Sequence, residues 1–151
     1  MSPNRSPRAV HVAVSTDGVR TPVAATRLAA AAERVLRAER ATTAMVSVTL
    51  VSASAMAKLN QKHLGHAGPT DVIAFGFRDP RGAVVGDVYL CPSVARENAK
   101  RFGVGVREEL LRLAVHGTLH VLGHEHPEGE ARLDSPMWHR QEQLLAQVMR
   151  A

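Results

Sequence analysis

The stretch that decides the fold is REELLRLAVHGTLHVLG, residues 107–123. Wound as a helix, this segment carries apolar side chains on nearly every face, which is typical of a helix buried on all sides. Gly123 can end the helix, because glycine adopts the left-handed conformation common at helix C-termini. The segment therefore predicts a buried central helix around which the rest of the chain packs.

The segments on either side of this helix alternate between two hydrophobic periods. Valine-rich stretches with every second residue apolar predict strands, and we expect them at 9–15, 44–52, 71–77 and 84–91, the last two forming a hairpin. Apolar stripes of helical period predict helices, expected at 21–41, 54–64, 92–103 and 132–150, with a loop at 65–70. Thr21 is expected to cap the first helix, with Pro22 in its first turn.

Length and composition narrow the class of protein. A chain of 151 residues with 45% hydrophobic residues is typical of one globular domain, which we place at 9–151 after a flexible leader at 1–8. No segment is long and apolar enough to span a membrane, and the polar start is unlike a secretory signal. The single cysteine, Cys91, excludes a disulfide framework and suits a cytoplasmic protein; it is expected to be a buried structural thiol.

The charge balance is basic. A net charge of +5 favours a polyanionic partner such as RNA, although an arginine-rich proteome explains it equally well. Four arginines share one face of the predicted first helix, namely Arg20, Arg27, Arg34 and Arg37. That face is either a basic ridge for RNA or an ordinary solvated surface. Aromatic residues make up only 3% of the chain, which argues against a stacking platform for single strands.

The central helix and the turn after it carry the candidate chemistry. His116 and His120 are one helical turn apart on one face, and His126 can fold back after Gly123 as a third ligand. The spacing H-x-x-x-H-x-x-G-x-x-H matches the metzincin zinc pattern except for its glutamate. Three neutral histidines with an open fourth position suit a catalytic zinc. We expect one Zn²⁺ per chain, with Ni²⁺ or another divalent ion fitting the same ligands.

The missing glutamate indicates which reaction such a site could support. Zinc peptidases place a glutamate directly after the first histidine as general base, and this chain has Gly117 there. A close approach of backbone or substrate would explain a glycine inside a helix. Phosphodiester cleavage depends less on a protein base, because a metal polarises the phosphoryl oxygen and RNA brings its own 2′-hydroxyl. The site is therefore interpreted as a phosphoesterase rather than a metalloprotease.

Four stretches together resemble a known family. HGTLHVLGHEH (116–126) resembles H-G-x-L-H-L-x-G-Y-D-H of the YbeY family, and LNQKHLGHAGPTDVIAF (59–75) resembles L-N-x-x-Y-R-G-x-x-x-P-T-D-V-L-S-F. VGDVYLCPSVA (85–95) and MWHRQEQLL (137–145) are similar to its L-G-D-I-x-I and M-x-x-x-E segments. The resemblance implies an α+β fold, with a small mixed four-stranded sheet packed on a buried central helix and flanking helices. It also implies a metal-dependent endoribonuclease of rRNA maturation, with His116, His120 and His126 as ligands.

The chain departs from the family pattern at several positions. The arginine of Y-R-G, expected to contact RNA phosphate, is Leu64 here, and His63 takes the place of the tyrosine. This bears on catalytic strength and not on metal binding. His66, Arg78 or Arg81 could supply the charge instead. In addition, Ala74 replaces a serine, and Y-D-H is H-E-H.

Other polar residues have a local structural interpretation, and four of them also have a functional one. Thr70 and Asp71 could lie near the metal cleft or cap a turn, and His124 or Glu125 could orient a ligand imidazole or be exposed. We expect Asp87 to be a buried hydrogen-bonding hub and His139 to be structural.

The residues and the resemblance together predict a cytoplasmic, zinc-dependent endoribonuclease. The resemblance implies that it is single-strand-specific, processes the 3′ end of small-subunit rRNA and acts in ribosome quality control. Its partners would be single-stranded RNA or rRNA and the ribosome or small subunit. The RNA-contacting candidates are Arg27, Arg34, Arg78, Arg81 and His66. The alternative is a non-catalytic ribosome-assembly factor with a structural metal and an RNA-docking basic face.

Overall fold

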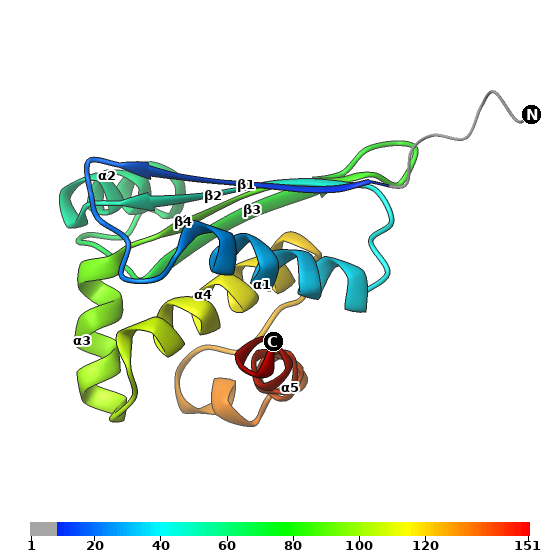
Figure 1. Ribbon diagram of the computed structural model, residues 1–151. Coiled ribbons are helices and arrows are strands. Elements are labelled where there is room, and N and C mark those ends of the chain that lie inside the picture. Colours follow the sequence, from blue (N-terminus) through cyan, green and yellow to red (C-terminus); the bar gives the residue numbers. More distant parts are fainter. Residues whose placement is uncertain (1–8) are drawn as a thin grey trace, which may run out of the picture.

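The computed structural model describes residues 9–151, so the expected leader at 1–8 lies outside the described residues. One four-stranded sheet runs in the order β1-β2-β4-β3 (Figure 1). Its first three members are parallel, and β3 pairs antiparallel with β4. The strands are β1 (Val10–Asp17), β2 (Ala44–Val51), β3 (Val72–Arg78) and β4 (Val84–Leu90).

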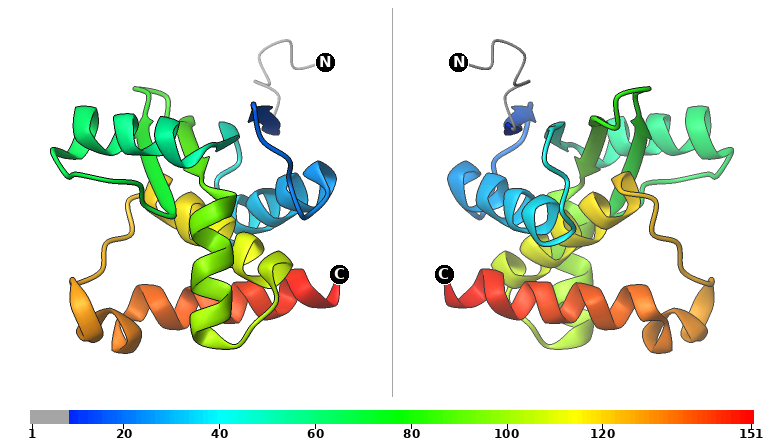
Figure 2. Two further views of the ribbon diagram at one scale, coloured as in Figure 1. Left: turned by 90° about the vertical axis from the view of Figure 1, so that its left-hand side faces the viewer. Right: turned by 90° about the vertical axis from the view of Figure 1, so that its right-hand side faces the viewer.

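Helices cover both faces of this sheet. They are α1 (Ala25–Ala38), α2 (Ala53–Leu64), α3 (Pro92–Phe102), α4 (Val106–Val121), the short 3₁₀ helix η1 (Gly129–Asp134) and α5 (Pro136–Arg150). Helices α1 and α4 lie against one face, α5 lies on the side of α4 away from the sheet, and α2 packs on the opposite face (Figures 1 and 2). The expected α+β class and mixed four-stranded sheet are confirmed.

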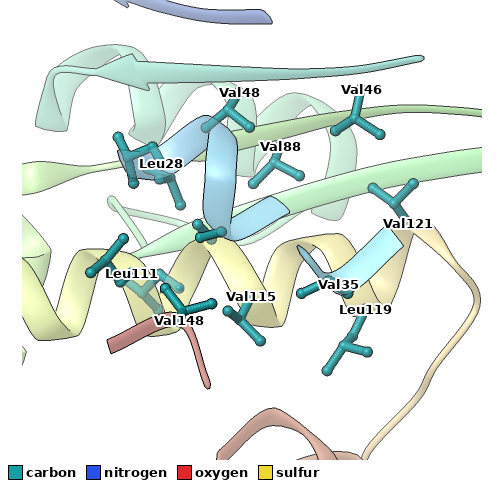
Figure 3. Packing of buried hydrophobic residues seen from close by; sticks show 14 of the residues in the cluster. Leu28, Val35, Val46, Val48, Val88, Leu111, Val115, Leu119, Val121 and Val148 are labelled. Carbon is teal, nitrogen blue, oxygen red and sulfur yellow. The ribbon is translucent and has the colours of Figure 1, made fainter. Parts of the chain in front are cut away.

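The core forms where the alternating strand residues meet the apolar helices. Val46, Val48 and Val88 point from the sheet toward α4, and Val115 and Leu119 lie on the side of α4 away from the sheet (Figure 3). Ten of the sixteen residues of α4 are buried, as the apolar pattern predicted. The helix ends at Val121, and Gly123 follows with a φ of 97°. The core thereby holds the C-terminal turn of α4 in one place on the sheet.

The first helix begins later than the sequence suggested. Residues 21–24 form a turn, and α1 starts at Ala25. Thr21 does not cap the helix, because its hydroxyl donates to the carbonyl of Val23 at 2.6 Å. Val23 is buried in the core, so the chain bends there to bring its side chain inward before the helix starts.

The last helix is also interrupted. The segment predicted as one helix at 132–150 is η1 followed by α5, with Ser135 between them. Pro136 has no N–H to continue a helix and suits the first helical position. Ser135 accepts a hydrogen bond from the backbone N–H of Trp138 at 3.2 Å. It therefore caps the N-terminus of α5 and separates that helix from η1.

Three side chains settle expectations that do not concern the site. Cys91 is fully buried, as expected. Asp87 is exposed, and it accepts a hydrogen bond from the hydroxyl of Ser47 at 2.5 Å, so the prediction of a buried hub is wrong: position 87 points to the outer face of the sheet. His139 is exposed and lies 3.7 Å from an Asp134 oxygen, so it has no structural role in the core.

Within residues 9–151, none of the helices has the length and apolarity needed to cross a membrane.

Candidate metal centre

The three histidines chosen by their spacing lie together. His116 and His120 occupy the C-terminal half of α4, and His126 lies in the loop beyond it. Their ring centroids are 4.5, 5.1 and 4.9 Å apart in pairs. One nitrogen from each ring lies within 4.8 Å of the other two. The arrangement brings three possible ligand atoms to one point at the end of the buried helix.

Hydrogen bonds fix which nitrogen each ring offers. The Nδ1 atom of His116 lies 2.7 Å from Oε1 of Gln141. That of His120 lies 2.8 Å from the carbonyl oxygen of His124, and that of His126 lies 2.9 Å from the carbonyl oxygen of Pro127. Because all three partners are oxygen acceptors, each Nδ1 carries the hydrogen and donates it. Each Nε2 therefore keeps a free lone pair.

Burial keeps the rings of His116 and His120 neutral. Burial lowers the pKa of His116 to about 4, although the hydrogen bond with Gln141 opposes this shift. Burial also lowers the pKa of His120. Metal-bound histidine must be unprotonated, so these two rings are in the binding form at neutral pH. Three imidazoles of fixed tautomer are the donor set of a zinc site that keeps one position open.

Gln141 holds the ring of His116 and was not singled out from the sequence. It lies on α5 and is 1% exposed. Its amide nitrogen donates to Glu142 at 3.1 Å, and Arg112 in turn donates to Glu142 at 3.0 and 3.2 Å. These bonds turn Oε1 of Gln141 toward His116. Four residues after Met137, Gln141 stands at the glutamate of M-x-x-x-E, a match that could have identified it.

Gly117 has no room for a side chain. A Cβ at this position would lie 2.6 Å from Cγ1 of Val88 and 3.2 Å from Cγ2 of Val72. The expected neighbour was backbone or substrate, and the structure places valine side chains of β3 and β4 there instead. A glutamate at position 117 would therefore collide with β4. There is therefore no room at position 117 for the general base of a zinc peptidase, which agrees with the preference for a phosphoesterase over a metalloprotease.

A cleft opens beside the histidines. Its volume is about 280 Å³, and it lies between α2, the edge strand β3 and the loop after α4. The lining residues are Leu64, Val72, Ile73, Ala74, His120, Gly123, His124 and Glu125. Leu64, 49% exposed, therefore lies across the cleft from a candidate ligand. The main departure from the family pattern falls at the site itself.

The other sequence candidates are spread over the surface. Arg27 and Arg34 are exposed on α1, His66 is exposed in the loop after α2, and Arg78 and Arg81 are exposed at the β3–β4 turn. None of these five lines the cleft. At about 3.3 Å per residue along a strand, Arg78 is roughly 13 Å from Ala74. The turn arginines therefore do not take the place of an arginine at position 64.

The remaining polar candidates take local roles. Asp71 accepts hydrogen bonds from the backbone N–H of Val72 at 2.8 Å and from the amide of Asn98 at 2.9 Å. It caps the start of β3 and does not line the cleft, and Thr70 is within 3.4 Å of it. Glu125 is an exposed residue of the cleft rim, whereas the carbonyl of His124 orients His120.

Comparisons with known proteins identify relatives of this chain. The family model described as endoribonuclease YbeY matches residues 14–149. A Frankia casuarinae protein named endoribonuclease YbeY is 41% identical over 133 residues, which is 80% of this chain and 65% of the relative. One of the same name from Thermotoga petrophila is 38% identical over 103 residues, covering 68% of this chain and 67% of the relative.

A solved structure supports the same grouping. The solution structure of TM1509 from Thermotoga maritima superimposes with a TM-score of 0.59 at 27% identity, covering 91% of this chain and 89% of that one. The family match extends over nearly all of the described residues and includes the three converging histidines. The chain therefore belongs to the endoribonuclease YbeY family.

Proposed function

We propose that residues 9–151 form one zinc-dependent endoribonuclease domain that cuts single-stranded RNA in the cytoplasm, with His116, His120 and His126 holding the ion. Its roles would be maturation of the 3′ end of small-subunit rRNA and ribosome quality control, in contact with the ribosome or its small subunit. The observation that carries the proposal is the convergence of three imidazoles whose Nδ1 hydrogens are all accepted by oxygens.

The residues of the centre support phosphodiester chemistry. When bound, zinc supplies Lewis acidity toward a phosphoryl oxygen. The protein keeps its three imidazoles oriented, and the cleft beside His120 provides room for a single strand. No protein base follows His116, since Gly117 packs against Val88. The 2′-hydroxyl of RNA can serve as nucleophile without such a base, which is why RNA suits this site better than a peptide.

The surface charge supports an RNA substrate. The net charge is +5, and the relatives are named endoribonucleases. Phosphate contacts position a nucleic acid without reading its sequence. We assign this guiding role to the exposed cations Arg27, Arg34, Arg78, Arg81 and His66.

The direct test is cleavage of a 5′-labelled single-stranded RNA carrying the small-subunit 3′ end, beside the same RNA as a duplex. Zinc-loaded protein is expected to cut the single strand. A chelator or His116→Ala should abolish cutting, and added zinc should restore only the chelated wild type. About one ion per chain is expected for three ligands at one centre. Cutting that persists in His116→Ala would show that the histidine centre is not the active site.

One observation favours a second function. Leu64, an uncharged residue, lies at the cleft where the family pattern has an arginine. A ribosome-assembly factor with a structural metal would bind RNA and zinc but leave the RNA intact. Metal-dependent RNA binding without cleavage in the same assay would replace the endoribonuclease proposal with this one.

A further inference from the structure

The loop that carries the third histidine is tied to a carboxylate from a distant helix. Glu39 is the residue that ends α1. Its Oε1 accepts a hydrogen bond from Nε2 of His124 at 2.5 Å. Its Oε2 accepts from both Nε and Nη2 of Arg140 on α5, at 3.1 and 3.0 Å. One carboxylate therefore joins α1, α5 and the loop after α4.

The same loop residue also orients a candidate ligand. The carbonyl of His124 accepts the Nδ1 hydrogen of His120 at 2.8 Å. Glu39 holds the side chain of His124, and the backbone of His124 holds the ring of His120. A hydrogen-bonded path thus runs from Arg140 through Glu39 and His124 to a ring of the metal centre.

The Glu39 contacts are those of an anchored carboxylate. The side chains of Glu39, His124 and Arg140 are 19%, 32% and 30% exposed, so all three are partly buried. Burial raises the pKa of Glu39, but the hydrogen bonds from Arg140 and His124 outweigh it and leave the pKa below its ordinary value. Glu39 is therefore charged at neutral pH and accepts both partners at once.

We propose that Glu39, clamped by Arg140, is a positioning residue of the metal centre, which sets the loop at His124 so that His120 presents Nε2 to the ion. This inference rests on the proposed metal site. Partners that orient a ligand imidazole typically change metal affinity 10- to 100-fold when removed. Glu39 acts through the loop, so we expect an effect near the lower end of that range.

The first measurement is zinc affinity by competition with a chromogenic chelator. Glu39→Ala and His124→Ala are each expected to bind zinc about tenfold more weakly. Because both substitutions remove the same link, the double variant should bind zinc no more weakly than the single variant with the lower zinc affinity. Glu39→Gln keeps an oxygen acceptor for His124 and should recover most of the affinity.

A matched control separates this role from general stabilisation. Arg107 donates from Nε to the carbonyl of Pro22 at 3.1 Å, so it also joins distant segments. It lies nine residues before His116 on α4, roughly 14 Å at 1.5 Å per residue. Arg107→Ala should lower stability but leave zinc affinity unchanged.

The second measurement reads the ring itself. In the ¹⁵N-labelled metal-free protein, long-range proton–nitrogen correlations report the tautomer of each histidine. Wild type should show the Nδ1–H tautomer at both His116 and His120. Glu39→Ala should give a mixture of tautomers at His120 alone, because His116 keeps its bond to Gln141.

The two measurements distinguish failure of the Glu39 inference from failure of the proposed metal centre. Unchanged zinc affinity and an unchanged His120 tautomer in Glu39→Ala would overturn the inference. Failure of the wild type to bind zinc would overturn the proposed metal centre instead, and the tautomer of His120 would still show whether Glu39 positions that ring.

Discussion

Gln141 accepts the Nδ1 hydrogen of His116 with an amide, which carries no charge. A carboxylate in the same place would stabilise the protonated ring, whereas the amide leaves burial to dominate and the pKa of His116 at about 4. The chain therefore orients this ring without making it basic. Competition by protons for His116 is confined to acidic solution.

Removing this acceptor should weaken the centre. We expect Gln141→Leu to bind zinc about 10- to 100-fold more weakly, because the ring of His116 loses the hydrogen bond to Gln141 that orients it. Gln147→Leu makes the same change on α5 at a residue without a hydrogen bond to the centre and serves as the control. Chelator competition measures both, and equal affinities would contradict the orienting role of Gln141.

The pKa of His116 also predicts how metal-free stability depends on pH. The folded value of about 4 lies below the ordinary 6.5 because of burial, so between these values the unfolded chain binds the proton more strongly. Acidification through this window should lower the free energy of unfolding by at most about 1.4 kcal/mol per pH unit from this group. Urea unfolding of chelated wild type and His116→Asn checks it: the variant should show a shallower dependence.

The cleft residue Leu64 offers a gain-of-function test. An arginine there would add a charge-assisted hydrogen bond to phosphate, with a net value of about 1.5–3 kcal/mol. Leu64→Arg is therefore expected to raise the cleavage rate about tenfold or more. Met149→Arg adds the same charge at an exposed residue in the last turn of α5. A similar gain in both variants would show that net charge, and not position 64, limits the rate.

Much of the centre could be predicted because its three histidines lie within one helix end and its turn. Their spacing alone places His116, His120 and His126 together. Gln141, 25 residues from His116, could be found only through its match to M-x-x-x-E, and Glu39, 85 residues from His124, could not be found from the sequence. Only the packing of α1 and α5 against α4 brings them in. The spacing of residues along the chain does not show such contacts between distant segments.

Helix α4 lies unusually close to the sheet at its C-terminal end. A Cβ at Gly76 would lie 2.7 Å from the Cα of Val121, and a Cβ at Gly86 would lie 2.8 Å from the carbonyl oxygen of Phe75 and closer still to Val121. Together with Gly117, these glycines let the helix carrying His116 and His120 rest directly on β3 and β4. The position of the ligands relative to the cleft depends on this contact.

A methyl group at the contact should cost stability. Gly76→Ala meets the backbone of Val121, which cannot rotate away as a side chain can, and overpacking of this kind costs about 1–3 kcal/mol. Urea unfolding should show that loss. Gly105→Ser, which has open space around its Cβ and can cap α4, is expected to be at least as stable as wild type. Equal stability of Gly76→Ala and wild type would mean that α4 can shift.

The elements themselves were predicted well where the hydrophobic period was long. The strands and α4 appear close to their expected bounds. The errors at Thr21 and Ser135 arose at helix starts, where the burial of Val23 and the ring of Pro136 decided the boundary. Asp87 was misjudged because its apolar neighbours in sequence point to the other face of the sheet. A period of two puts neighbours in sequence on opposite faces.

No lysine or arginine of residues 9–151 lines the cleft. Arg27 and Arg34 are exposed on α1, away from the residues that line the cleft. If they contact phosphates, they act over an extended strand and not at the scissile bond. Their contribution should then appear in affinity and its salt dependence, with little change in the rate of cutting.

The salt dependence of RNA binding measures these contacts. For a single strand, log K falls with log salt with a slope of about −0.7 per phosphate contact. The double variant Arg27→Ala, Arg34→Ala should therefore reduce the slope by about 1.4. Arg96→Ala, Arg101→Ala removes two exposed arginines from α3 instead and should leave the slope nearly unchanged. Equal reductions in both would mean that only total charge matters.

The close packing of Gly117 against Val88 of β4 also restricts how this chain could evolve. Conversion to a zinc peptidase begins with a glutamate at position 117, and that side chain meets Val88. Shrinking Val88 first would leave a cavity in the core, and adding the glutamate first would force the helix off the sheet. Each single change is therefore expected to lower stability. The histidine spacing that this chain shares with zinc peptidases therefore does not make the two sites easy to interconvert, because either single change is expected to destabilise the fold.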